Sequence, residues 1–340
     1  MVTPILVPFF FEEYVEHAGF LDDQPVFALA DGQVRLFNDQ GEQTIEAHNG
    51  LTTAALSHDG KMLITGGEDG RVIAINAQCE TQQLGQAERK WIGKVATGPK
   101  GAVAWTAGRD TFVYSDKVVW GKTADNGHSR QFTHKHTPED LAFAPKGLRI
   151  AIARYNGADL HWVGTQATPE SLEWSGPHHL IKFSPDGRFL VTSMQDNVLH
   201  GWRLDNGAHM RMAGYPTKVK NIDFSAFTAK SGKWLATAGA NSAVLWPYTG
   251  SEGPMGKMPK ELGQRADSLV TCVACHPEDA VVAIGYADGM VGLVSIEDEK
   301  DALLRRPGEG AVTSMGWDMA GLRLAFGTQS GEGGMVDISG

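Results

Sequence analysis

The sequence predicts an all-β fold, a single β-propeller of four-stranded units, and three observations lead to that prediction. One phrase of short strands and turns recurs along the chain, hairpin signals bound the strands, and no long segment has the apolar period of a helix. The phrase recurs at about 42 residues, which is the range of one four-stranded propeller blade. No such unit can bury its apolar side alone, so neighbouring units have to pack on one another.

The phrase is clearest in residues 179–204, which read HLIKFSPDGRFLVTSMQDNVLHGWRL. A first strand ends at Phe183, residues 184–187 turn, and a second strand follows. Asp196 and Asn197 then turn into a third strand. Asp-Gly pairs such as Asp69-Gly70 supply the same hairpin signal in other copies. A fourth strand is expected in the polar stretch that follows each copy.

Eight copies of this phrase cover the chain as one domain, residues 1–340. The predicted repeat units are residues 14–50, 51–89, 90–138, 139–177, 178–218, 219–268, 269–310 and 311–340, the last with strand 3–10. The sequence stops after the third strand of the last copy, whereas the spare strand lies at the other end. Because an open sheet edge promotes aggregation, we expect strand 3–10 to pair into the last blade.

The repeats resemble those of the WD40 family, in particular bacterial WD-repeat proteins of similar length. In that family a Ser or Thr, an Asp and a Trp form a hydrogen-bonded group on each blade. Thr192, Asp196 and Trp202 match it, with His178 as the fourth member. Thr65 and Asp69 match in part, with Ile75 where Trp is expected. Since most family members have seven blades, seven is the alternative to eight.

Composition narrows the class of partner. The 340 residues carry a net charge of −10 and no basic stripe, which argues against nucleic acid. The three cysteines are too few for a disulfide framework and fit a reducing compartment. The apolar run near residue 5 is far shorter than the ~20 residues of a membrane span. We therefore expect a cytoplasmic protein without nucleic-acid or membrane partners.

Two motifs suggest cofactor or metal sites. Cys272 and Cys275 begin a CxxCH pattern typical of haem attachment. Side chains three apart on a strand point to opposite faces, however, so we interpret them as packed strand residues and expect no cofactor. His128, His134 and His136 lie in the His-rich loop 123–138, where imidazoles are candidate zinc ligands. This loop defines the alternative function, a metal-handling or enzymatic propeller.

The function predicted from the sequence is a non-catalytic scaffold for protein–protein interaction. One face of the propeller should consist of the turns between second and third strands and of the loops that enter each blade. Interface energy concentrates in Trp, Tyr and Arg, and loops commonly carry recognition. The candidate partner-binding residues on this face are Arg109, Tyr155, Gln195, Asn241 and Tyr286, with Trp91 and Trp120 as apolar anchors.

Overall fold

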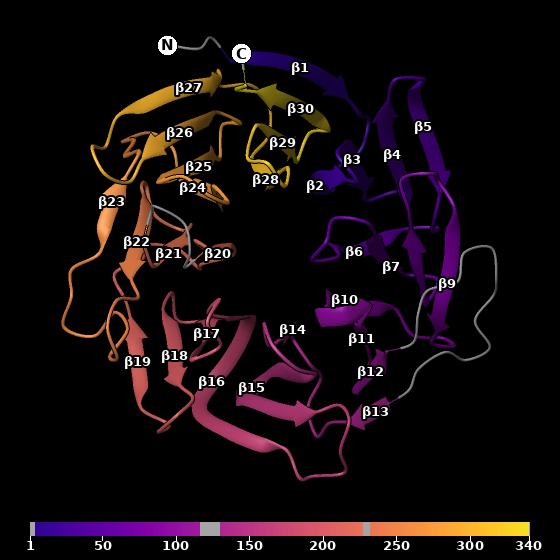
Figure 1. Ribbon diagram of the computed structural model, residues 1–340, viewed down its shortest axis with the longest axis vertical. Helices are drawn as coiled ribbons and strands as arrows, with labels where there is room; N and C mark the ends of the chain where they lie inside the picture. Colours follow the sequence, from indigo (N-terminus) through magenta and orange to yellow (C-terminus); the bar gives the residue numbers. More distant parts are fainter. Residues whose placement is uncertain (1–3, 116–129, 227–231, 340) are drawn as a thin grey trace. The chain divides into compact units, whose positions relative to one another are not determined.

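The computed structural model describes residues 4–115, 130–226 and 232–339, and among these residues the chain is built of strands (Figure 1). The only described helical element is a short 3-10 turn, Pro99–Gly101. The thirty strands form seven antiparallel sheets, six of four strands and one of six. The all-β class predicted from the sequence is confirmed.

Four of the sheets hold strands that follow one another in sequence. Their strands are Leu51–Leu56 (β6), Leu63–Gly67 (β7), Arg71–Ile75 (β8) and Thr81–Gln86 (β9); Ile92–Thr97 (β10), Val103–Ala107 (β11), Asp110–Tyr114 (β12) and Arg130–Thr133 (β13); Ile222–Phe224 (β20), Trp234–Thr237 (β21), Ala243–Pro247 (β22) and Lys260–Leu262 (β23); and Val270–Cys275 (β24), Val281–Tyr286 (β25), Val291–Ser295 (β26) and Asp301–Arg305 (β27).

The remaining strands form one further consecutive sheet, the six-stranded sheet and the sheet that holds both the first and the last strand. They are Val15–Leu21 (β2), Gln24–Leu29 (β3), Gln33–Asn38 (β4) and Gly41–Glu46 (β5); Asp140–Phe143 (β14), Arg149–Trp162 (β15), Glu170–Phe183 (β16), Phe189–Met194 (β17), Leu199–Arg203 (β18) and His209–Met212 (β19); and Ile5–Phe10 (β1), Val312–Trp317 (β28), Arg323–Thr328 (β29) and Glu332–Asp337 (β30).

The six-stranded sheet reconciles eight sequence repeats with seven sheets. It contains the two repeat units 139–177 and 178–218, which the long strands β15 and β16 join. β15 pairs with β14 up to Ala153 and with β16 from Tyr155 onward, and the β15–β16 register shifts between Tyr155 and Gly157. Counted by sheets the fold therefore has seven blades, which is the alternative that the repeat count left open.

The described residues group into two compact units. The first unit comprises Met1–Phe20, Ser184–Phe189 and Asp196–Gly340. The second unit comprises Leu21–Phe183 and Leu190–Gln195. The division of the chain into one domain stays a prediction.

Apolar packing between neighbouring sheets forms the core of each unit. In the second unit Ile64 and Leu84 from the β6–β9 sheet pack with Ile92 and Trp105 from the β10–β13 sheet. The contact is close, since a Cβ added at Gly85 would lie 2.4 Å from the Trp105 ring. Each sheet thus buries a face that its own strands leave open.

The same rule holds in the first unit and decides the cysteine pattern. Cys272 packs in the cluster with Val312 and Phe326, whereas Cys275 packs in a different cluster with Val282. Both thiols are buried, and neither forms a disulfide. Alternation along strand β24 therefore sends the two side chains to opposite faces, as the sequence analysis expected.

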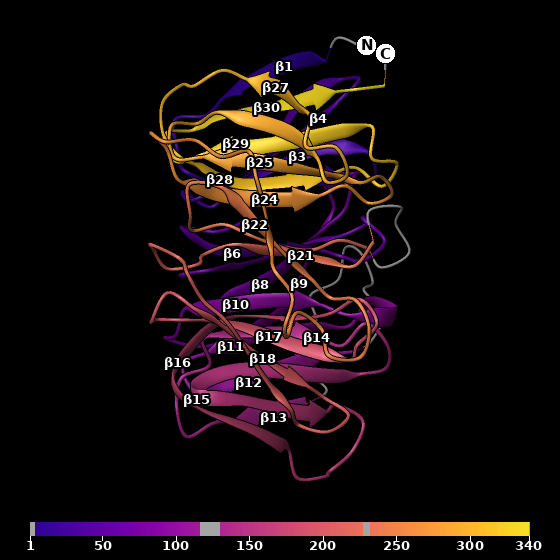
Figure 2. The ribbon, with the colours of Figure 1, turned by 90° about the vertical axis from the view of Figure 1, so that its left-hand side faces the viewer.

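The first strand of the chain pairs with the last. β1 lies antiparallel beside β30 over six residue pairs, from Ile5 opposite Asp337 to Phe10 opposite Glu332, as Figures 1 and 2 show. The backbone hydrogen bond that follows this ladder runs from the Phe11 N–H to the Gly331 carbonyl, with an N···O distance of 2.7 Å. The predicted pairing of strand 3–10 into the last blade is confirmed.

Deleting residues 1–10 should destabilise the protein, because it removes this ladder and leaves β30 as an unpaired edge. We expect the free energy of unfolding to fall by at least about 2 kcal/mol, measured by urea denaturation. Deleting residues 1–3 alone is the control, since it leaves the ladder intact. An unchanged unfolding midpoint in the longer deletion would show that β1 contributes nothing to stability.

Candidate functional site

The candidate site is built from turns that antiparallel order brings to one end of the strands. In the sheets of the second unit, the turn between second and third strands and the loop to the next sheet lie at the same end. We call the surface formed by residues 68–71, 87–91, 107–110, 134–139 and 154–157 the rim. Polar residues and glycines dominate it because they satisfy turn geometry.

Loop 87–91 is held to the turns on either side of it. The Ala87 N–H donates to the Gly70 carbonyl at 2.8 Å, and Lys90 Nζ lies 2.9 Å from Asp110 Oδ2. The Lys90 stem crosses Gly108, whose φ of 61° is left-handed. This anchoring leaves the neighbouring Trp91 side chain 64% exposed. A large apolar ring is therefore presented to solvent on a fixed loop.

Hydrogen bonds also join turn 107–110 to loop 134–139. The His134 N–H donates to the Arg109 carbonyl at 2.8 Å, and the Thr133 hydroxyl donates to Asp110 Oδ1 at 2.7 Å. Burial tends to raise the pKa of Asp110, but the hydrogen bonds from Thr133 and Lys90 outweigh it and lower the pKa. Asp110 is thus an ionised anchor. The Arg109 side chain is exposed on this turn.

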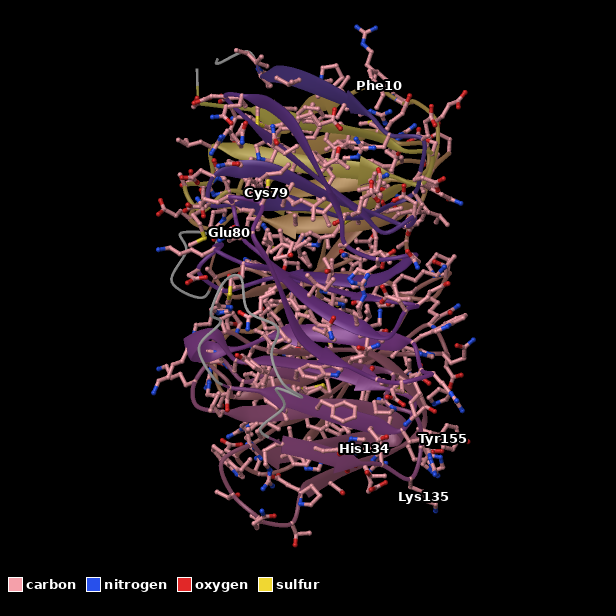
Figure 3. All side chains as sticks on the ribbon, turned by 90° about the vertical axis from the view of Figure 1, so that its right-hand side faces the viewer. Phe10, Cys79, Glu80, His134, Lys135 and Tyr155 are labelled. Atoms are coloured by element: carbon pink, nitrogen blue, oxygen red, sulfur yellow. The ribbon has the colours of Figure 1, made fainter. Side chains whose placement is uncertain are left out.

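The bend in β15 presents the next aromatic ring. Asn156 and Gly157 both have positive φ, and a Cβ at Gly157 would lie 2.0 Å from the Leu172 carbonyl oxygen, so only glycine fits there. The bulge turns Tyr155 outward, where it is 49% exposed. Its ring contacts His136 at a centroid distance of 5.8 Å. Figure 3 shows Tyr155 and Lys135 at one margin and Cys79 and Glu80 at the opposite one.

The structure therefore brings three predicted partner-binding residues, Trp91, Arg109 and Tyr155, onto the rim. Gln195 belongs to the same unit and is exposed, with Oε1 at 3.1 Å from His179 Nε2. Asn241 belongs to the first unit and is half-buried between β21 and β22. Trp120 lies outside the described residues.

The prediction that Tyr286 lies on the partner-binding face is wrong. Its side chain is only 2% exposed, and its hydroxyl donates to the Gly263 carbonyl. Burial raises its pKa to about 12. Tyr286 is still paired with Val270 in the ladder, so strand alternation directs it into the core. It is a packing residue and does not belong to an exposed face.

Sequence reasoning missed Lys90, Lys135 and the role of His136 on the rim. All three lie just after the fourth strand of a sheet, where the repeat phrase is weakest. A signal was nonetheless present, because residues between a fourth strand and the next first strand must reach the same end as the turns. Counting strand ends would have located them.

The predicted WD-type group is present in part. His178 Nδ1 lies 2.7 Å from Thr192 Oγ1, and its Nε2 lies 3.0 Å from the Trp174 carbonyl. Asp196 and Trp202 belong to the other unit, where Asp196 is exposed and Trp202 is buried. His178 and Thr192 are both fully buried, so their hydrogen bond satisfies polar atoms that water cannot reach.

The partial copy at Thr65 and Asp69 is completed by His48. His48 Nδ1 lies 3.0 Å from Asp69 Oδ1, and Nε2 lies 2.9 Å from Thr65 Oγ1. Burial lowers the pKa of His48 despite the hydrogen bond that its Nδ1 donates to Asp69, so the imidazole is neutral near pH 7. The same is true of His178, whose pKa burial also lowers. These groups anchor turns and need no catalytic role.

A tyrosine takes the histidine position in the first unit. The Tyr215 hydroxyl lies 2.7 Å from Thr237 Oγ1 and accepts a hydrogen bond of 2.7 Å from Trp246 Nε1. Tyr215 and Thr237 are both buried. Thr237 and Trp246 are therefore linked through the Tyr215 hydroxyl, a member of the group that the sequence did not indicate.

The residues proposed as metal ligands separate in the structure. His128 lies outside the described residues, and His136 packs on Tyr155. His134 instead approaches Asp159 and His161, and one ligand atom of each lies within 4.8 Å of the others. Neither Asp159 nor His161 was selected from the sequence, because both lie on strand β15 rather than in the loop.

In the described part of the chain, no helix is long and apolar enough to cross a bilayer. None of the described cysteines, Cys79, Cys272 and Cys275, forms a disulfide.

Comparison with known proteins gives partial matches in sequence and full-length similarity to a solved structure. Residues 40–74 match the family model for the WD domain, G-beta repeat. Human WD repeat-containing protein 55 is 25% identical over 213 residues, covering 58% of this chain and 53% of that protein. The 77 kDa echinoderm microtubule-associated protein of Strongylocentrotus purpuratus is 23% identical over 190 residues, covering 52% and 25%.

The chain spans about half the length of the WD repeat-containing relatives that it matches. Among solved structures, the computationally designed Ika8 protein aligns with a TM-score of 0.73 at 17% identity, covering 97% of this chain and 98% of that one. This likeness shows the fold alone, which is a β-propeller of antiparallel four-stranded sheets. The predicted fold class is thereby confirmed.

Replacing Tyr215 by Phe should lower the free energy of unfolding by about 1–3 kcal/mol, because it leaves the indole N–H of Trp246 without its acceptor. Tyr155→Phe is the matched control and should change stability by less than about 0.5 kcal/mol, since Tyr155 is exposed. Urea denaturation of both variants checks the pair. Equal losses would show that the Tyr215 hydroxyl has no special role.

Stability should fall as the pH drops below 6.5. His48 and His178 have lowered pKa values in the folded protein, so below pH 6.5 the unfolded chain binds protons that the folded chain does not. The slope reaches about 1.4 kcal/mol per pH unit for each histidine. Urea midpoints at pH 7.5, 6.5 and 5.5, with chelator present, measure it. A midpoint that is flat over this range would contradict neutral buried imidazoles.

Proposed function

We propose that this chain is a WD40-repeat propeller that acts as a non-catalytic scaffold and binds protein or peptide partners through the rim. The WD-repeat match at residues 40–74 and the WD-repeat relatives support the family. WD-repeat propellers generally bind proteins. The observation that carries the proposal is the alignment of Trp91, Arg109 and Tyr155 along connected turns of one unit.

The chemistry of the rim suits a broad protein interface. Two exposed aromatic rings, Trp91 and Tyr155, supply apolar area with little conformational freedom to lose. Arg109 supplies five donors in a rigid plane. These side chains stand on turns that backbone bonds and the Lys90–Asp110 ion pair fix in place. Preorganised anchors of this kind lower the cost of ordering a surface on binding.

The proposal extends to the class of partner and to the cellular location. We propose a cytoplasmic protein without nucleic-acid or membrane partners, and the lack of disulfides among the described cysteines and the net charge of −10 support this view. The alternative, a metal-handling or enzymatic propeller based on the His-rich loop 123–138, gains one observation, the approach of His134 to Asp159 and His161.

Affinity purification from the native cell with mass spectrometry tests the scaffold. We expect the wild-type chain to capture partner proteins in stoichiometric amounts, and the combined variant Trp91→Ala, Arg109→Glu and Tyr155→Ala to lose them at an unchanged Tm. These side chains are exposed, so their replacement should cost little stability.

Lys61→Glu is the matched control. Lys61 is exposed in the same unit, but it lies between β6 and β7, at the opposite end of the strands from the rim. The control should retain every partner. Partners that persist in the rim variant, or that Lys61→Glu removes equally, would place the binding surface elsewhere.

A further inference from the structure

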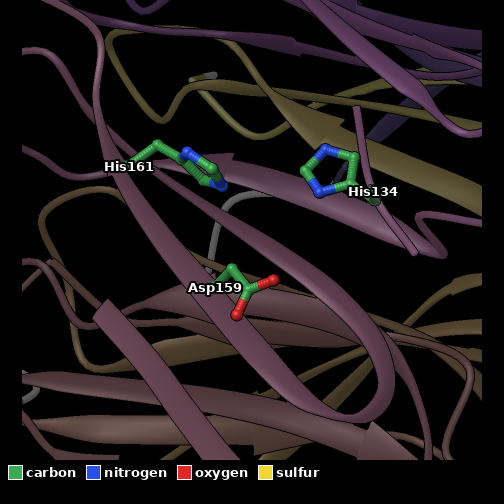
Figure 4. Close-up of side chains that lie close together, drawn as sticks. All are labelled: His134, Asp159 and His161. Carbon is green, nitrogen blue, oxygen red and sulfur yellow. The ribbon is translucent and has the colours of Figure 1, made fainter. Parts of the chain in front are cut away.

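We propose that His134, Asp159 and His161 form a binding site for a divalent cation of the zinc class. The site lies in the second unit, where His134 belongs to the rim and Asp159 and His161 to β15, and Figure 4 shows the three side chains facing a common space. It rests on observations separate from those that support the scaffold.

Strand geometry explains why these residues meet. Asp159 and His161 are two apart on β15, so their side chains share one face of the strand. His134 follows β13, whose sheet lies alongside, and its backbone is tied to Arg109. One ligand atom of each residue lies within 4.8 Å of the other two. A cation between them requires only a small inward movement of the side chains.

One nitrogen of His161 lacks any other role. Its Nε2 is buried and has no hydrogen-bond partner among the described residues. By contrast, His48 and His178 are buried to a similar degree and have partners for both ring nitrogens. The Phe132 ring packs on the His161 ring at a tilt of 41°, with a centroid distance of 4.2 Å, which excludes water on that side. A bound metal would satisfy this lone pair.

His134 has the orientation that a ligand needs. Its Nε2 lies 3.0 Å from the Thr111 hydroxyl, which can accept the Nε2 proton. Nδ1 then keeps its lone pair for a cation, in the usual pattern where one ring nitrogen is oriented by a neighbour and the other ligates. Burial lowers the pKa of both histidines, that of His161 to about 4, so both rings are neutral at pH 7.

Asp159 retains one acceptor position. Its Oδ1 accepts from Arg154 Nη2 and from the Ser171 hydroxyl, whereas Oδ2 accepts only from Arg154 Nε, at 2.9 Å. A carboxylate has about four acceptor sites, so one remains on Oδ2. Burial raises the pKa of Asp159, but the hydrogen bonds from Arg154 and Ser171 outweigh it, and the group is ionised.

The local charge accommodates a cation despite the guanidinium nearby. Arg154 is paired with both Asp159 and Glu173, so this group of three carries a net charge of −1. Arg154 then acts as the partner that orients the ligating carboxylate. Two imidazoles and one carboxylate are a ligand set for Zn²⁺ or a similar ion, with a fourth position left for water.

Titration of untagged, chelator-treated protein with Zn²⁺ alone, followed by calorimetry, tests the site. We expect one saturable site per chain, and Co²⁺ should give visible d–d absorption that Zn²⁺ abolishes. His161→Gln and His134→Gln should each weaken Zn²⁺ binding by at least about tenfold. His58→Gln, at an exposed histidine, is the control and should bind as the wild type does.

Absence of saturable binding of either ion to the wild-type chain would overturn the proposal, and so would equal affinity in the His161→Gln variant. Should a variant fail to fold, the wild-type measurements still decide. A rise in Tm on adding Zn²⁺, seen in the wild type and in His58→Gln, supports the site. Loss of partner capture in the rim variant with Zn²⁺ binding intact would separate the two proposals.

Discussion

Each sheet in this chain has two apolar faces, and its own four strands can cover neither of them. On the β6–β9 sheet, Leu63 and Ile75 belong to one cluster, whereas Ile64 and Val72 belong to another. Strand alternation produces this split, and burial of both faces requires a neighbour on each side. Packing of sheet on sheet is therefore the interaction on which every other feature depends, because it fixes the strand ends that carry the turns.

Because sheet packing fixes the strands, the turns between them tolerate polar residues and strained backbone conformations. Buried polar groups such as His48 with Thr65, or Tyr215 with Thr237, tie a turn or loop to the strand beneath it. Within each group the polar atoms are satisfied by one another rather than by water, and His48 also holds turn 68–71 of the rim through Asp69. The rigidity of the surface is thus a product of the core.

The sequence predicted the strands, the repeat and the pairing of β1 better than it predicted side-chain direction. Tyr155 and Tyr286 lie near the same turn of the repeat, but they are one position apart. Counted from the equivalent pairs Phe143–Ile150 and Cys275–Val282, Tyr286 takes the position of Arg154, and Tyr155 lies one residue further on. Tyr286 therefore faces the core at the end of its strand, whereas Tyr155 is exposed at the turn. Likewise, Asp159 and His161 lie on a strand that looks structural in sequence, and only folding brings them to His134. Local sequence patterns predict the strands, but side-chain contacts between strands far apart in the sequence are known only from the folded structure.

The pairing of β1 with β30 has a consequence for biosynthesis. β1 leaves the ribosome long before its partner β30, so the β1–β30 ladder cannot form until translation has passed residue 337. Until then Ile5, Leu6 and Val7 have no strand beside them, and even in the finished protein they stay partly exposed. A nascent chain that stalls before β30 would expose this apolar segment, to which chaperones could bind.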